Sequence, residues 1–170
     1  MNARRTPSRR LCRMLHLAMP ALATLVLGVA IATQASAAAG PRGTAAHVRA
    51  RGTVRFDART ARIDVDLTID PGFHIYANPA SLPELIPTAL RFPEFPGVRP
   101  RYPAGTTLST SFAHIPLAVY QGRVQLLADL PAAALTGRST IRAIVQVQAC
   151  TMHLCLPPSD LTLRIAVPLR

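Results

Sequence analysis

The sequence contains no tryptophan and no lysine, and aromatic residues account for only 5% of its 170 residues. Without a tryptophan, and without a widely spaced pair of cysteines, the chain cannot be an antibody-type domain, in which a core disulfide packs against a buried tryptophan. Every basic residue is an arginine, and the arginines are spread along the chain rather than gathered in one stripe. This distribution argues against a nucleic-acid partner and is typical of solvated strand faces.

Long apolar runs are also missing, except for one near the N-terminus. Residues 1–14 carry five arginines and no acidic residue, residues 15–32 are almost wholly apolar, and Ala35-Ser36-Ala37 follows. These three features together predict a secretory signal peptide over residues 1–37, cleaved after Ala37. The alternative is an uncleaved membrane anchor. No later run approaches the roughly 18 apolar residues that a spanning helix needs, so we do not expect the mature chain to insert into a membrane.

Removal of the signal peptide leaves the length of one ordinary domain. We expect a short flexible lead over residues 38–44, followed by one folded domain over residues 45–170. Five of the 19 arginines belong to the signal peptide, and the other 14 stand against 8 acidic residues, a net charge of +6.

Alternation of apolar and polar residues runs through the domain. The clearest case is residues 61–70, where Ile63, Val65, Leu67 and Ile69 alternate with Asp64, Asp66, Thr68 and Asp70. This period of two predicts a strand with one buried face and one wet face. The other predicted strands cover residues 47–56, 73–78, 88–92, 98–102, 117–120, 123–129, 139–149 and 161–167.

Turn signals separate these strands. Gln121-Gly122 predicts a hairpin turn, and residues 131–135 predict one helical turn at most. Seven to nine short strands in a chain of this length predict an all-β fold, an immunoglobulin-like antiparallel β-sandwich.

Cysteine is scarce, and its placement is informative. Of the three cysteines, Cys12 belongs to the signal peptide, which leaves Cys150 and Cys155 in the exported part. In an oxidising compartment two nearby cysteines are expected to bond. A strand ends just before Cys150 and another begins after Pro158, so the pair occupies the shoulders of a hairpin loop, where the Cα atoms can approach the roughly 5.5 Å of a disulfide.

Three interpretations of this loop remain open. A structural clasp would contribute only about 2 kcal/mol, because the closed loop is so short. A redox centre fits better, since short exposed loops favour reducible bonds. Pro157 and Pro158 would hold the loop in one shape, and a nearby His153 would favour a thiolate.

The third interpretation is a copper(I) site. Its ligands would be Cys150, Met152, His153 and Cys155, which are soft or borderline donors that suit this ion. Zinc fits less well, because only three good ligands are local and a structural site needs four. The spacing of the four residues does not force them to converge.

The segment QACTMHLCLPP, residues 148–158, read together with GFHIYANP, residues 72–79, resembles a known family. It is similar to the periplasmic N-terminal domain of the thiol:disulfide interchange protein DsbD, and the resemblance extends over about residues 45–170. Ile86–Thr88 and the stretch from Tyr120 to Leu126 add to it. The resemblance implies an immunoglobulin-like periplasmic domain that passes reducing equivalents from a thioredoxin-like donor to oxidised periplasmic proteins, without an organic cofactor.

The resemblance also implies roles for single residues. Cys155 would form mixed disulfides with partners, and Cys150 would resolve them. Phe112 would belong to a cap loop that shields the cysteines, and His74 and Tyr76 would flank the site. His153 and Pro157 are expected beside the cysteines from the loop sequence itself, as argued above. Family proteins continue into a membrane segment and a thioredoxin-like domain, whereas this sequence stops at Arg170, so we expect either a stand-alone version or a fragment. We also expect a monomer.

Overall fold

The computed structural model describes residues 43–110 and 113–169. The predicted signal peptide and most of the predicted lead lie outside these residues. Within them, no helix has the length and apolar character needed to cross a membrane. The strands are β1 (Val48–Asp57), β2 (Thr60–Ile69), β3 (His74–Tyr76), β4 (Ala89–Arg91), β5 (Thr106–Leu108), β6 (Leu117–Tyr120), β7 (Arg123–Pro131), β8 (Thr140–Val147), β9 (Ala149–Cys150) and β10 (Ser159–Ala166).

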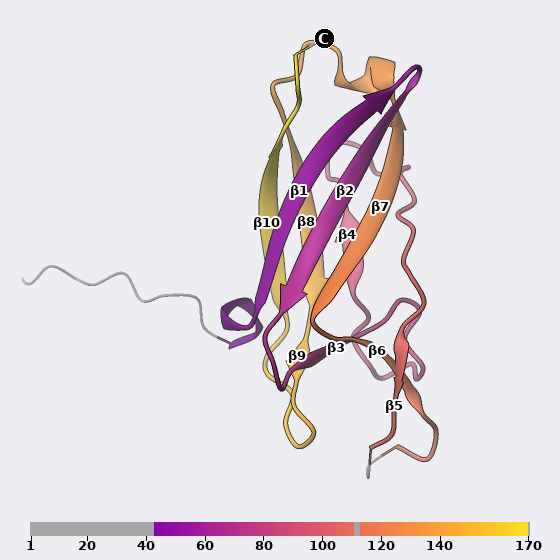
Figure 1. The fold of residues 1–170 in the computed structure, drawn as a ribbon, viewed down its shortest axis with the longest axis vertical. Helices are drawn as coiled ribbons and strands as arrows, with labels where there is room; N and C mark the ends of the chain where they lie inside the picture. The colour runs from indigo at the N-terminus through magenta and orange to yellow at the C-terminus, as the bar shows by residue number, and fades with distance from the viewer. Residues whose placement is uncertain (1–42, 111–112, 170) are drawn as a thin grey trace, which may run out of the picture. The chain divides into compact units, whose positions relative to one another are not determined.

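Two antiparallel sheets face each other and enclose the main core. One has the strand order β1-β2-β7 and the other the order β10-β8-β4, and Figure 1 shows the second sheet behind the first. The inward residues of the two sheets, such as Ile63, Leu126 and Val145, are fully buried in one cluster. The predicted antiparallel β-sandwich is therefore confirmed, and the predicted helical turn is the 3-10 helix η2 (Ala132–Leu135).

A third sheet, with the order β5-β6-β3-β9, lies at one end of the sandwich. Its existence corrects the predicted hairpin at Gln121-Gly122. Strand β6 pairs with β3 and β5, whereas β7 pairs with β2, so the two strands beside this turn belong to different sheets. Gly122 has a left-handed φ of 63° and its carbonyl accepts a hydrogen bond from Ile69. The turn is a corner between sheets, which spacing alone cannot distinguish from a hairpin.

One further predicted strand does not form, and one strand of the structure was not predicted. Residues 98–102 form no strand; Arg101 makes only an isolated antiparallel pair with Leu127, because the prolines around it remove backbone donors. Strand β5 was not predicted, since its sequence TTL has no apolar alternation. It is an edge strand defined by its pairing with β6.

Asp64 is buried, although the alternation in β2 predicts it on the solvent-exposed face. Its exposed fraction is only 1%, although Asp66 on the same face is exposed. β2 is the central strand of its sheet, with Thr53 and Leu127 directly opposite Asp64 on either side. Arg55 reaches across from β1 and places Nη2 2.7 Å from Oδ2 of Asp64, so the buried charge is paired.

Gly105 lets the third sheet pack closely. A Cβ atom at this position would lie 2.8 Å from Cβ of Ala77 and 2.9 Å from the backbone nitrogen of Val119. Real Cβ atoms do not approach backbone this closely, and the backbone of β6 cannot move without disturbing its pairing with β3.

Replacement of Gly105 by alanine is therefore expected to destabilise the domain by about 1–3 kcal/mol, the usual cost of overpacking. Urea unfolding of the disulfide-bonded protein measures this difference. Gly97→Ala is the matched control, because a Cβ at Gly97 would meet nothing within 4 Å. Equal stability of the two variants would contradict the packing argument.

Candidate functional site

The two cysteines lie at the end of a hairpin, as predicted. β8 leads through β9 to Cys150, and β10 begins shortly after Cys155. The two cysteines face each other as an isolated antiparallel pair and are joined by a disulfide, with Cα atoms 4.0 Å apart. The amide of Leu156 donates to the carbonyl of Ala149 at 2.9 Å, just behind the disulfide. Figure 1 shows this hairpin loop beyond β9, at the same end of the domain as the third sheet.

Thr151 closes the loop between the cysteines. Its amide donates to the carbonyl of Leu154 at 2.8 Å, and its hydroxyl accepts hydrogen bonds from the amides of His153 and Leu154 at 3.3 and 3.1 Å. Such local bonds are typical of threonine in turns. Thr151 was not predicted from the sequence as a site residue, although a threonine directly after a strand is a recognisable turn signal.

The two cysteines differ in burial. Cys150 has an exposed fraction of 0%, whereas Cys155 is exposed. Cys150 belongs to a second apolar cluster, on the face of the third sheet that points away from the main core. That cluster also contains Tyr76, Leu117 and Val119, and it is covered by Leu82, Leu85, Leu108 and Ala113. An attacking thiol from outside can therefore reach Cys155 but not Cys150.

Thr44 anchors the strand that carries Cys150. It lies in the 3-10 helix η1 (Gly43–Ala46) and is fully buried. Its hydroxyl accepts a hydrogen bond from the amide of Ala149 at 2.9 Å. This amide would otherwise be a buried donor without a partner, which is costly. The sequence offered no signal for this contact, because the two residues are 105 positions apart.

Tyr76 touches both sulfurs. Its hydroxyl oxygen lies 3.6 Å from Sγ of Cys155 and 3.7 Å from Sγ of Cys150, within the range of hydrogen bonds to sulfur. Burial raises the pKa of Tyr76, so its hydroxyl keeps its proton at neutral pH. The phenol can therefore donate a hydrogen bond to whichever sulfur becomes a thiolate.

His74 lies directly opposite Cys150 in the β3–β9 pair. Its ring packs edge-on against the ring of Tyr76, with centroids 5.8 Å apart. The residue is only 2% exposed, and its Nε2 atom has no hydrogen-bond partner. Burial lowers the pKa of His74, because the charged imidazolium loses its hydration.

The other predicted site residues lie further out. His153 and Pro157 are both exposed, and Pro157 packs beside Gly43 of η1. Phe112 lies outside the described residues. The adjacent Ala113 does reach the apolar cluster around Cys150.

Comparison with known proteins identifies the family. The family model for the thiol:disulfide interchange protein DsbD, N-terminal, matches residues 45–166. The chain belongs to this family. No curated protein matches the sequence at a significant level.

The fold is similar to those of two solved structures. The N-terminal domain of DsbD from Neisseria meningitidis, in its reduced form, is 17% identical over 72% of this chain and 86% of that chain, with a TM-score of 0.50. The N-terminal periplasmic domain of ScsB from Proteus mirabilis is 14% identical over 69% of this chain and 46% of that one, with a TM-score of 0.49. The first likeness supports the immunoglobulin-like fold.

Membership in the DsbD family decides between the interpretations of the cysteine loop in favour of thiol–disulfide exchange. Among the described residues, no three His, Cys, Asp or Glu side chains are placed to hold a metal ion. Met152 is 45% exposed and His153 is exposed too, and each sulfur is bonded to the other. The copper interpretation is therefore not favoured.

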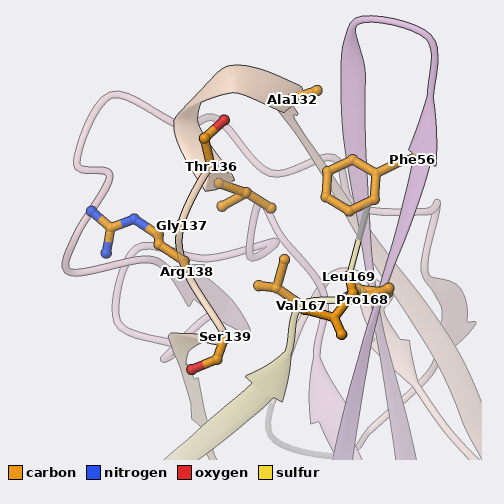
Figure 2. Close-up of a pocket in the computed structure, with 10 residues that line it drawn as sticks. Phe56, Ala132, Thr136, Gly137, Arg138, Ser139, Val167, Pro168 and Leu169 are labelled. Carbon is orange, nitrogen blue, oxygen red and sulfur yellow. The ribbon is translucent and has the colours of Figure 1, made fainter.

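A pocket elsewhere on the domain does not include the cysteines. Its volume is about 330 Å³, and Figure 2 shows Phe56, Thr136, Val167 and Pro168 in its wall. It lies beyond the C-terminal end of β10, whereas the cysteines precede the start of that strand. Arg138, which also lines it, lies with its guanidinium 5.1 Å from the centre of the Phe95 ring.

Replacement of Tyr76 by phenylalanine is expected to make the midpoint potential of the cysteine pair more negative by about 10–30 mV. The lost hydrogen bond to sulfur is worth about 0.5–1.5 kcal/mol and stabilises the reduced form, and 30 mV corresponds to about 1.4 kcal/mol. Equilibration with glutathione buffers, followed by thiol alkylation, measures the potential.

Tyr120→Phe is the matched control for this measurement. The Tyr120 hydroxyl donates to the carbonyl of Pro103 at 2.8 Å and packs with the main core, away from the sulfurs. It should change stability but not the potential. An unchanged or more positive potential in Tyr76→Phe would contradict a hydrogen bond to the reduced sulfurs.

Proposed function

We propose that this domain passes reducing equivalents from a thioredoxin-like donor to oxidised exported proteins. The unequal burial of the two bonded cysteines carries this proposal. A donor thiolate attacks the sulfur of the exposed residue Cys155, forms a mixed disulfide, and releases Cys150 as the leaving thiolate. A second donor thiol then frees Cys155, so that both cysteines are reduced.

The same asymmetry serves the transfer to an acceptor. The thiolate of Cys155 attacks the acceptor's disulfide, and a mixed disulfide forms between the two proteins. Cys150 then attacks Cys155 from within the protein and releases the reduced acceptor. The short loop supports this use over a clasp, because closing a loop of about six residues contributes only about 2 kcal/mol to stability.

Trapping of the intermediate tests the assignment of the two cysteines. Cys150→Ser protein whose Cys155 carries a nitrothiobenzoate group, mixed with a purified thioredoxin-like protein that lacks its second active-site cysteine, is expected to release nitrothiobenzoate and accumulate a mixed disulfide through Cys155. Non-reducing electrophoresis and peptide mass mapping detect the adduct. Cys155→Ser is the matched control and should form little adduct, because its remaining sulfur is buried. The opposite pattern would overturn the assignment.

The potential provides a second check on the same proposal. Structural disulfides typically have midpoint potentials below about −300 mV. A value far below this limit would identify an inert clasp, whereas a value within reach of a thioredoxin-like donor supports exchange.

Export to the periplasm is part of the proposal. It rests on the basic segment, the apolar segment and the Ala35-Ser36-Ala37 site. When the full chain is expressed in a bacterium, we expect the periplasmic form to begin at Ala38, as read by intact mass. Ala37→Arg should abolish cleavage at this bond and leave the larger precursor. A periplasmic form that retains residue 1 would indicate an uncleaved anchor.

A further inference from the structure

Cys150 has to lose a proton in a place that water does not reach. If it resolves the mixed disulfide on Cys155, as proposed above, it must attack as a thiolate. Its exposed fraction is 0%, and its cluster consists of Tyr76 and apolar side chains. Apolar surroundings disfavour a charged thiolate. The proton therefore needs an acceptor inside the protein.

The strand register places one such acceptor beside the sulfur. His74 and Cys150 are directly opposite residues of an antiparallel pair, so their side chains share one face, with Cβ atoms about 4.5–5.5 Å apart. Tyr76, two residues further along β3, lies on the same face, and its hydroxyl touches both sulfurs. In the disulfide, the Cys150 sulfur is bonded to that of Cys155, and after reduction the Cys150 side chain is free to adopt its other staggered rotamers on this face.

The imidazole of His74 is buried with an unused nitrogen. Among the described residues, the buried side-chain atoms without a hydrogen-bond partner are Nε2 of His74 and the carboxylate oxygens of Asp64. The carboxylate of Asp64 is paired with Arg55, which leaves Nε2 of His74 without either kind of partner. An unpaired buried polar atom destabilises the folded state, and an apolar side chain that served only for packing would avoid this cost.

The other titratable groups around this face cannot take the proton. The pKa of Tyr76 is raised by burial, so its phenol stays protonated and is no base at neutral pH. The segments that cover the cluster contribute leucines and Ala113, and the titratable residues of those segments, Glu84 and His114, are exposed. His153, on the loop between the cysteines, is exposed as well.

We propose that His74 is the base that accepts the proton of the Cys150 thiol when Cys150 resolves the mixed disulfide on Cys155. The sulfur–hydrogen bond of Cys150 breaks, and the proton moves to Nε2 of His74. The electron pair left on sulfur forms the bond to Sγ of Cys155, while the bond from Cys155 to the partner's sulfur breaks. The partner leaves as a thiolate and is reduced, and the two cysteines of the domain are oxidised to a disulfide.

The buried site accommodates both protonation states of His74. Burial lowers the pKa of His74 and keeps the resting ring neutral. In the tautomer that is protonated at Nδ1, the unpartnered Nε2 carries the free electron pair. Once the proton has moved, the imidazolium lies beside a thiolate, and opposite charges at short range stabilise each other. When a donor reduces the disulfide, the same proton can return to the departing Cys150 sulfur.

The two thiol steps can be followed separately with dithiobis(nitrobenzoate). The exposed Cys155 of the reduced protein attacks the reagent and releases one nitrothiobenzoate, and Cys150 then resolves the mixed disulfide and releases the second. Stopped-flow absorbance records both phases across a range of pH. In His74→Phe, we expect the second phase at neutral pH to slow by about 100-fold, the lower range of general base catalysis, with the first phase unchanged.

The pH profile separates a base from a packing residue. The wild-type second phase should fall only in acid, where His74 becomes protonated, whereas in His74→Phe it should rise steadily with pH as the thiol ionises unaided. His74→Gln, which retains polarity but does not titrate, should follow His74→Phe. His114→Gln is the control for an exposed histidine and should follow the wild type.

The outcomes distinguish the role of His74 as a base from the resolving role of Cys150, on which it rests. A wild-type protein that releases only one nitrothiobenzoate would overturn the resolving role of Cys150 itself. Release of both, with the same pH profile in the wild type and the two His74 variants, would overturn the role of His74 alone. Thermal unfolding of the oxidised variants confirms that each protein compared is folded.

Discussion

The site depends on the position of β3 between two partners. This three-residue strand pairs with β9 on one side and with β6 on the other. Ile75 packs into the main core, while Tyr76 belongs to the second cluster on the opposite face. A sheet buried on both faces holds its side chains in place, so the tyrosine hydroxyl stays close to both sulfurs although it lies 79 positions before Cys155.

The hairpin combines a fixed side with an accessible side. Cys150 ends a strand whose amide is held by Thr44 and whose side chain is covered by apolar residues. Cys155 lies across from it on a loop closed mainly by its own backbone and by Thr151. Exchange chemistry needs this combination, because one sulfur must meet another protein while its partner waits in a constant position.

Prediction from the sequence succeeded for strands whose own alternation of apolar and polar residues marks them. The alternation in β1, β2, β7, β8 and β10 reflects one buried and one exposed face, and these strands lie where the pattern predicts them. Prediction failed where the structure of a segment depends on which strand it pairs with. Arg101 lies in an extended segment that makes one backbone pair, and Gly122 turns the chain from one sheet into another. Neither outcome has a periodic signal.

The sequence by itself determined the class of fold and the chemistry of the site. Cys150 and Cys155, their spacing and the prolines that follow are all visible without coordinates, as is the pattern of an exported chain. Only the tertiary structure decided which cysteine is exposed, that Asp64 is buried, and that His74 lies opposite Cys150. The reason is physical: a period of two assigns side chains to faces, but the contacts between strands are set by how the strands pair and in which register.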